Sequence, residues 1–214
     1  MDGKETRDQN AYSVEFLLAE YQRLMESFWH TEELGERRVN FFVTLTAAVI
    51  AALAATRDQG ISLSQGRVDP IFFYGLGALL LFGLVTLVRI IRRNLESHRY
   101  LRATGRIRRY FTETDQGIGS HLYFEPRDDR PVRKKEWREI AFLGTGGLVE
   151  TIALVNCLIA AALWGLATIR SQWGGIWIWA LVGFILAWVV QFLYVKWRYE
   201  RGRPADEEIK FRGV

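Results

Sequence analysis

The sequence predicts an all-α membrane protein with four transmembrane helices and a cytosolic helical-hairpin stalk. Two observations lead to this fold class. Apolar residues come in four long blocks instead of being spread along the 214 residues, and basic residues gather in the segments that lie on one side of the predicted membrane. The mean hydropathy near zero averages these blocks with a highly charged remainder, so it does not indicate a soluble protein.

The four blocks are residues 39–56, 70–88, 140–169 and 174–195. The first, second and fourth carry no formal charge over 18, 19 and 22 residues, and the third carries the single acid Glu150. A helix crosses the hydrocarbon core with about 18 to 20 apolar residues. Each block is therefore expected to span the membrane.

The basic residues predict the orientation. Lys and Arg number 5 in residues 1–38, 13 in residues 92–139 and 6 in residues 196–214, whereas the two short connections between spans hold 3. Cytoplasmic loops carry an excess of positive charge. We therefore expect a multi-pass protein of the bacterial inner membrane with both termini in the cytosol.

These patterns divide the chain into five parts. They are a cytosolic acidic amphipathic helix (1–38), a first transmembrane hairpin (39–91), a cytosolic basic helix and loop (92–139), a second transmembrane hairpin (140–195) and a cytosolic charged tail (196–214).

The first helix is predicted from residue 13 onward, where apolar residues follow 3-and-4 spacing. Ser13 is a candidate N-cap. A lone glycine costs only about 1 kcal/mol in a helix, so Gly35 is not expected to stop this helix before the first span. Residues 1–38 hold 9 acidic residues against 5 basic ones, which makes this segment an acidic arm.

The second helix is predicted over residues 70–111, where an apolar run turns into an arginine-rich run without a proline or paired glycine after Pro70. Two helices that leave a transmembrane hairpin side by side, one acidic and one basic, should pair along their length. We expect a cytosolic stalk roughly 30 to 40 Å long, from ~1.5 Å per residue.

Residues 112–135 contain two prolines and two glycines and predict a loop. Its apolar patch of Leu122, Tyr123 and Phe124 either caps the stalk or touches a partner. The last two spans are joined by a tight hairpin, and the sequence RGRP from Arg201 is expected to stop the fourth helix.

Three polar residues lie within the predicted spans. Glu150 is the most informative, because an acid in hydrocarbon costs several kcal/mol unless it is neutral, paired or near water. It is either an ion-pathway or gating carboxylate, or a residue two to three turns from the cytosolic end that reaches wetted headgroups or Arg89. Asn156 and Gln191 are candidates for a binding site, although interhelical hydrogen bonding is the simpler interpretation.

Small residues suit close helix packing, within one subunit or between subunits. In the first span they form the row Ala47, Ala51 and Ala55, and in the second they are Gly75, Gly77 and Gly83.

The basic helix carries candidate anion-binding or lipid-binding residues. Anionic headgroups attract such side chains by about 1 kcal/mol each near the surface. The alternative is that they follow the positive-inside rule and neutralise the acidic arm. The candidates are Arg92, Arg93, Arg99, Arg102, Arg106, Arg108 and Arg109.

No catalytic arrangement is recognisable. His30, His98 and His121 are far apart in sequence and Cys157 is the single cysteine, so neither a metal site nor a cofactor is expected. We expect a non-enzymatic protein. Its expected partners are membrane lipids with anionic headgroups, other copies of the chain, and a cytosolic protein or nucleotide signal; nucleic acid is not expected.

A helix with Trp29 and the pair Arg37 and Arg38, feeding a transmembrane hairpin and followed by ESHRYLRATGRIRRYF, resembles the SLATT-type and Pycsar-type membrane effectors of bacterial nucleotide-signalling defence systems. The resemblance concerns the layout of residues 12–111, and those families usually have one hairpin where this chain has two. It implies an oligomeric, channel-like or membrane-permeabilising effector controlled through its stalk. The alternative is a membrane-anchored structural or adaptor subunit that docks a partner.

Overall fold

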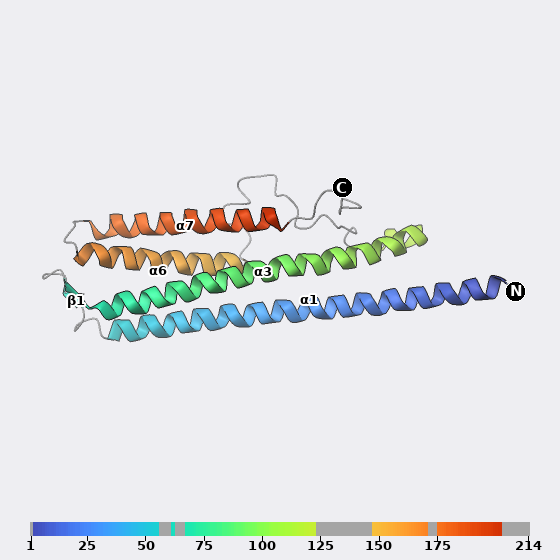
Figure 1. Cartoon of the computed structure of the whole chain (residues 1–214), viewed down its shortest axis with the longest axis horizontal. Coiled ribbons are helices and arrows are strands. Elements are labelled where there is room, and N and C mark those ends of the chain that lie inside the picture. The colour runs from blue at the N-terminus through green and yellow to red at the C-terminus, as the bar shows by residue number, and fades with distance from the viewer. Residues whose placement is uncertain (1, 56–60, 63–66, 123–146, 171–174, 203–214) are drawn as a thin grey trace. The chain divides into compact units, whose positions relative to one another are not determined.

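The computed structural model describes residues 2–55, 61–62, 67–122, 147–170 and 175–202 (Figure 1). The helices are α1 (Asp2–Ala55), α3 (Pro70–Thr114), α4 (Gln116–Gly119), α6 (Leu148–Arg170) and α7 (Ile176–Arg201). Between α1 and α3 lie β1 (Ile61–Ser62) and β2 (Arg67–Val68), which pair antiparallel. The described part of the chain is therefore almost entirely helical, as predicted.

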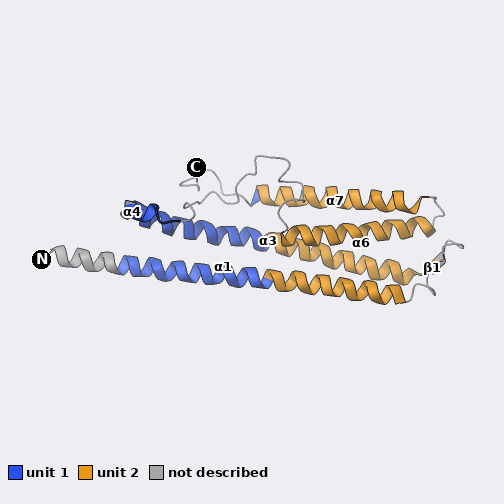
Figure 2. Cartoon of the chain, turned by 180° about the vertical axis from the view of Figure 1, so that it is seen from behind, with its two compact units in different colours: residues 1–34, 93–133, 201–214 blue, residues 35–92, 134–200 orange. Residues whose placement is uncertain are grey.

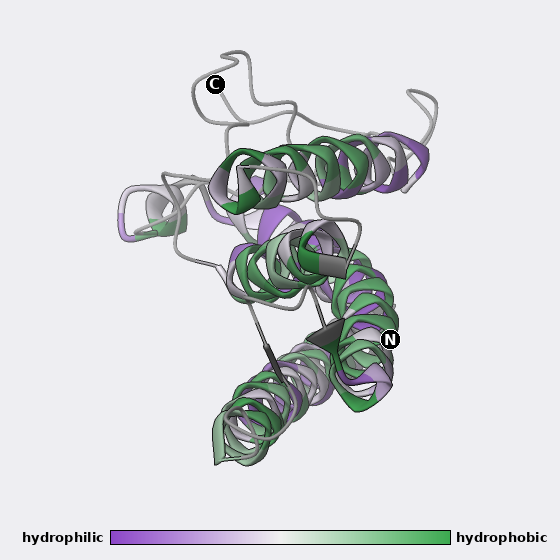
Figure 3. Ribbon diagram, turned by 90° about the vertical axis from the view of Figure 1, so that its left-hand side faces the viewer, coloured by the Kyte–Doolittle hydropathy of each residue, from purple (hydrophilic) through white to green (hydrophobic). Residues whose placement is uncertain are grey.

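Four of these helices, α1, α3, α6 and α7, are long and apolar enough to cross a membrane. In Figure 3 apolar residues, drawn green, occur on several sides of the helices, a pattern typical of helices that face lipid as well as one another. The predicted number of spanning helices is confirmed within the described residues.

Helix α1 runs without a break from Asp2 to Ala55. Gly35 lies buried inside it, so the prediction that this glycine does not interrupt the helix is confirmed. The prediction of Ser13 as the N-cap is wrong. Residues 2–12 are already helical and contain no proline, so nothing ends the backbone hydrogen bonding at Ser13.

Helix α3 begins at Pro70, the first helical position, where the missing N–H of proline costs nothing. Asp69 caps it, because its Oδ1 accepts from Ile71 N at 2.9 Å and its carbonyl accepts from Phe72 N at 3.1 Å. The predicted single helix from the apolar run into the arginine-rich run is confirmed.

The loop predicted from residue 112 begins later. Helix α3 continues to Thr114, and the short helix α4 follows with Asp115 as its N-cap, accepting from Gly117 N at 2.9 Å. The Asp115 side chain accepts from a backbone N–H that has no partner within the helix, and this bond starts the new turn. Of the predicted apolar patch, Leu122 is described; Tyr123 and Phe124 lie outside the described residues.

Helix α6 begins at Leu148, and residues 140–146 of the predicted third span lie outside the described residues. Helix α7 ends at Arg201. This end confirms that RGRP stops the fourth helix: Gly202 directly follows the last helical residue, and glycine favours helix ends.

The chain forms two compact units, coloured separately in Figure 2. Unit 1 comprises residues 1–34, 93–133 and 201–214, and unit 2 comprises residues 35–92 and 134–200. Helices α1 and α3 each contribute to both units.

The core of unit 2 is formed by side chains from α1, α3 and α6. The fully buried ones are Phe42, Leu87, Ile90, Ile91, Ile152, Asn156 and Cys157. Helix α7 adds the buried residues Gly183 and Gln191. By contrast, only 17% of the apolar window of α1 and 11% of that of α7 is buried. Much apolar surface is thus left for lipid or for another protein.

Glycines set the closest helix contacts of unit 2. A Cβ on Gly83 of α3 would clash with Oδ1 of Asn156 and would lie 2.8 Å from Cζ of Phe42. A Cβ on Gly183 of α7 would lie 2.6 Å from Cβ of Trp164. Gly83 therefore lets α1, α3 and α6 meet at one point, and Gly183 lets α7 approach α6.

The alanine row of the first span behaves differently. Ala47, Ala51 and Ala55 are exposed within the chain. The close packing within one chain uses the glycines and leaves this row uncovered.

We predict that Gly83→Ala lowers the stability of the protein by about 1 to 3 kcal/mol, the usual cost of overpacking. Gly77→Ala is the matched control on the same helix, because no atom lies within 4 Å of a Cβ at that position. Thermal unfolding in detergent should give a clearly lower Tm for Gly83→Ala alone. Equal Tm values for the two variants would contradict the tight contact at Gly83.

Candidate functional site

Asn156 and Gln191 join α6 and α7 in the interior of unit 2. Asn156 Nδ2 donates to Gln191 Oε1 at 3.1 Å. Gln191 Nε2 donates to the carbonyl of Ala187 at 3.2 Å and to Cys157 Sγ at 3.3 Å. Both carboxamides are buried, and the prediction that they make interhelical hydrogen bonds is confirmed.

The side-chain oxygen of Asn156 faces α3. Asn156 Oδ1 is buried without an N–H or O–H donor among the described residues. It occupies the place that a Cβ of Gly83 would take, so a Cα–H of Gly83 points towards it. Such Cα–H···O contacts are weak but recur where helices approach closely. The cluster thus fixes α3 as well as α6 and α7.

Glu150 lies in the first turn of α6, and not two to three turns inside a helix as expected. Its Oε2 accepts from Gly147 N at 3.0 Å, which satisfies one of the donors that every helix start leaves free. An acid is also favoured at this end by the helix dipole. A capping role accounts for Glu150 physically, and its role in an ion pathway stays a prediction.

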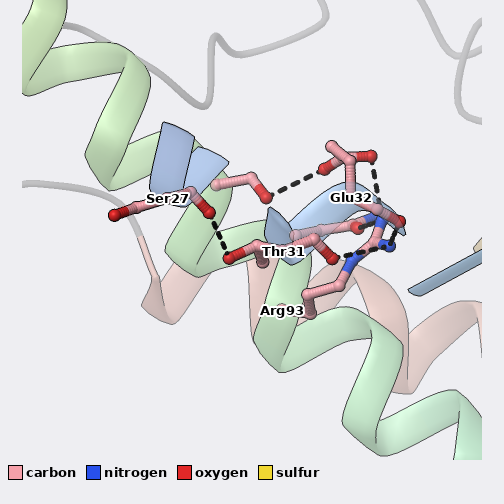
Figure 4. A network of polar contacts seen from close by, with 6 residues as sticks. Ser27, Thr31, Glu32 and Arg93 are labelled. Atoms are coloured by element: carbon pink, nitrogen blue, oxygen red, sulfur yellow. Dashed lines mark hydrogen bonds and ion pairs between the residues drawn. The ribbon is translucent and has the colours of Figure 1, made fainter. Parts of the chain in front are cut away.

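Among the predicted anion-binding arginines, Arg93 is largely buried, with 8% of its side chain exposed. Figure 4 shows its guanidinium beside Glu32 of α1, within unit 1. Arg93 Nη2 lies 3.2 Å from Glu32 Oε2, and Nη1 donates to the carbonyl of Glu32 at 3.0 Å. Ser97 Oγ donates to Glu32 Oε1 at 2.9 Å. We call Arg93, Glu32 and Ser97 the Arg93 clamp.

The Arg93 clamp is a specific instance of the predicted pairing between the acidic arm and the basic helix. Arg93 Nη1 also donates to the carbonyl of Thr31 at 3.5 Å. A planar guanidinium that binds a carboxylate and two backbone carbonyls is held more rigidly than a lysine would be. These contacts hold Arg93 within unit 1, and lipid binding by Arg93 stays a prediction.

The remaining candidate arginines divide by exposure. Arg102 and Arg108 are half-buried. Arg109 Nε lies 2.7 Å from Glu113 Oε1 on the same helix. Exposed ion pairs of this kind contribute little stability. The exposed arginines are Arg92, Arg99, Arg106 and Arg109.

A shallow hollow on α1 in unit 1 is lined by Glu26, Ser27, Trp29, His30 and Glu33. Trp29 is 63% exposed, and its ring meets that of Phe28 edge to face with centroids 5.3 Å apart. Among the described residues no group of three or more His, Cys, Asp or Glu side chains is placed to hold a metal ion.

Several functional contacts were not foreseen in the sequence. Ser97 and the carbonyl of Glu32 in the Arg93 clamp carry no sequence signal, although Ser97 lies four residues after Arg93 and so on the same helix face. Gly183 was missed as well, because a single glycine in an apolar span has no distinctive pattern.

Comparison with protein families, with curated proteins and with solved structures finds no match to this chain. The layout resemblance to nucleotide-signalling membrane effectors therefore stays a prediction.

We predict that Asn156 and Gln191 are energetically coupled. A double-mutant cycle of Asn156→Ala and Gln191→Ala should give a coupling energy of about 1 kcal/mol, the usual size for interhelical hydrogen bonds in membranes. The measurement is reversible unfolding in mixed micelles, with Asn40→Ala as an exposed control. Simple additivity of the two single effects would contradict the bond.

Proposed function

We propose that this chain is a non-enzymatic, oligomeric membrane protein that acts as a channel-like or membrane-permeabilising effector controlled through its polar helical hairpin. The observation that supports it best is the continuity of α1 and α3, which run without a break from the charged residues of unit 1 into the apolar residues of unit 2. In this proposal, a signal bound to the hairpin reaches the spanning helices through these two continuous helices.

Permeation requires more than one copy. The core of unit 2 is filled by large apolar side chains such as Phe42, Ile90 and Ile152. Such a core has no room for water or ions. A conducting path must therefore form between chains, and the uncovered faces of α1 and α7 provide surface for that contact.

In this proposal, exposed arginines of α3 bind anionic groups outside the chain. Arg92 and Arg99 are exposed and cationic, and each such residue near a membrane surface gains about 1 kcal/mol from anionic lipid. The same chemistry suits the phosphates of a nucleotide signal, the trigger that the layout resemblance implies.

A second candidate function is that of an adaptor subunit. The observation that favours it is the exposure of Tyr12, Phe16 and Trp29 on α1, each more than 60% exposed. Exposed aromatic side chains are typical of protein-binding surfaces. An adaptor would co-purify with a partner and would show no flux.

Flux through reconstituted vesicles tests the proposal. Potassium release from vesicles containing the wild-type chain should exceed that from protein-free vesicles. Arg93→Met, which breaks the Arg93 clamp, should change the rate severalfold. Arg23→Met removes an exposed arginine of α1 that has no place in the clamp, and it should match the wild type. No release from vesicles with the wild type or with Arg93→Met would overturn the effector function and favour the adaptor.

The proposed orientation places both termini and the residues around α4 in the cytosol of a bacterial cell. Its support is the excess of 24 basic residues outside the spans over 3 in the short connections. Ser120 is exposed, and Ser120→Cys adds a thiol to a chain whose own Cys157 is buried. A membrane-impermeant maleimide should label Ser120→Cys in inverted vesicles and not in intact spheroplasts. The reverse pattern would contradict the orientation.

A further inference from the structure

Unit 1 exposes an acidic and aromatic face on α1. Glu15, Glu26 and Glu33 are exposed there. At ~100° per residue they fall within a narrow sector of the helix, with Trp29 beside them. The hollow lined by Glu26, Ser27, Trp29, His30 and Glu33 overlaps this sector. The opposite side of α1 carries half-buried residues such as Leu24, Phe28 and Thr31, so the acidic face points away from the rest of unit 1.

Unit 1 also exposes a basic face on α3. Arg99, Arg106 and Tyr110 are exposed. The first two are seven residues apart and Tyr110 is four further on, so all three share one side of the helix. The Arg93 clamp uses a different side, because Arg93 and Ser97 turn towards Glu32. Arg99 is thus exposed while the hairpin stays closed.

The two faces lie at the same level along the hairpin. Helices α1 and α3 are antiparallel, and Glu32 binds both Arg93 and Ser97. Counting from this contact at ~1.5 Å per residue, Arg99 lies level with the segment between Glu26 and Trp29. When copies of the chain are inserted in the same direction into one membrane, a given residue lies at the same height above the membrane in every copy. Arg99 of one copy can therefore face Glu26 and Trp29 of the next without any shift along the axis.

The chemistry of the two faces is complementary. A guanidinium binds a carboxylate through two parallel hydrogen bonds and stacks on an indole ring, an attraction of about 0.5 to 1 kcal/mol at exposed sites. Glu26 and Trp29 offer both partners at adjacent positions of one helix face. This acidic face repels anionic lipid headgroups, whereas the basic face of the same chain fits it.

We propose that copies of this chain associate head to tail, with the basic face around Arg99 of one copy bound to the acidic face around Glu26 and Trp29 of the next. The contact joins two different surfaces, so it is heterologous and builds a ring if its rotation closes. The inference deepens the proposed function and rests on it, because it names the contact through which the oligomer forms.

Disulfide cross-linking between separately tagged chains tests the contact. Glu26→Cys in one chain and Arg99→Cys in the other should give a mixed dimer in vesicles under mild oxidation. Each variant alone should give none, because Cys157 is buried. Glu113→Cys replaces Arg99→Cys in the matched control. It is exposed on the same helix but about 18 Å farther along the axis than the level of Glu26, so it should not cross-link to Glu26→Cys.

Charge exchange provides a readout that does not depend on cysteine geometry. Glu26→Arg and Arg99→Glu should each weaken self-association at least tenfold, measured by energy transfer between labelled copies in vesicles. The double variant Glu26→Arg with Arg99→Glu should restore it. Both positions are exposed, so the fold should tolerate the exchange.

The outcomes separate this inference from the proposed function. Oligomers that persist without the mixed cross-link and without an effect of charge exchange would overturn the head-to-tail contact and leave the effector function standing. Efficient linking of Glu26→Cys to itself would replace it with a symmetric contact. If Glu26→Cys became cross-linked to a different protein, the proposal that a second copy of the chain binds the acidic face would be wrong. Absence of any self-association would overturn both proposals.

Discussion

The hydrogen bond between Asn156 and Gln191 is the contact on which the packing of unit 2 depends. Apolar helices in lipid gain little by burying apolar surface against one another, because the lipid is as apolar as the helix. Their mutual position is then set by small residues that permit close approach and by polar groups that need a partner. Asn156 and Gln191 supply the polar partners, and Gly83 and Gly183 supply the close approach.

Unit 1 follows different rules. Its helices carry charges along their length, and the Arg93 clamp joins α1 to α3 by an ion pair, a hydroxyl and two backbone carbonyls. A buried guanidinium is costly unless its donors are satisfied. Nη1 and Nη2 of Arg93 find acceptors on Thr31, Glu32 and Asn94, whereas its Nε has none among the described residues. Arg93 therefore favours one register of the two helices over its neighbours. This selectivity places the acidic and basic faces of the hairpin at matching levels, which is the geometry that the proposed head-to-tail contact requires.

The sequence predicted the helices well because their causes are local. Four apolar blocks gave four apolar helices, the lack of a breaker gave the continuity of α1 and α3, and RGRP gave the end of α7. The pairing of Asn156 with Gln191 was predictable in kind, since a carboxamide in an apolar span needs a partner. The failures concern helix ends and contacts between helices. Ser13 and Glu150 were misplaced because helix ends depend on which backbone groups find a cap, and the contacts of Ser97 and Gly83 depend on neighbours from another helix.

The proposed permeation depends on self-association in the membrane, because the described core of unit 2 is filled with apolar side chains. The most direct test is the number of subunits in lipid nanodiscs, measured by native mass spectrometry on the wild-type chain. We expect one discrete assembly of several copies that survives dilution. A strict monomer at all protein-to-lipid ratios would contradict it and would leave a membrane-anchored adaptor as the better description of this protein.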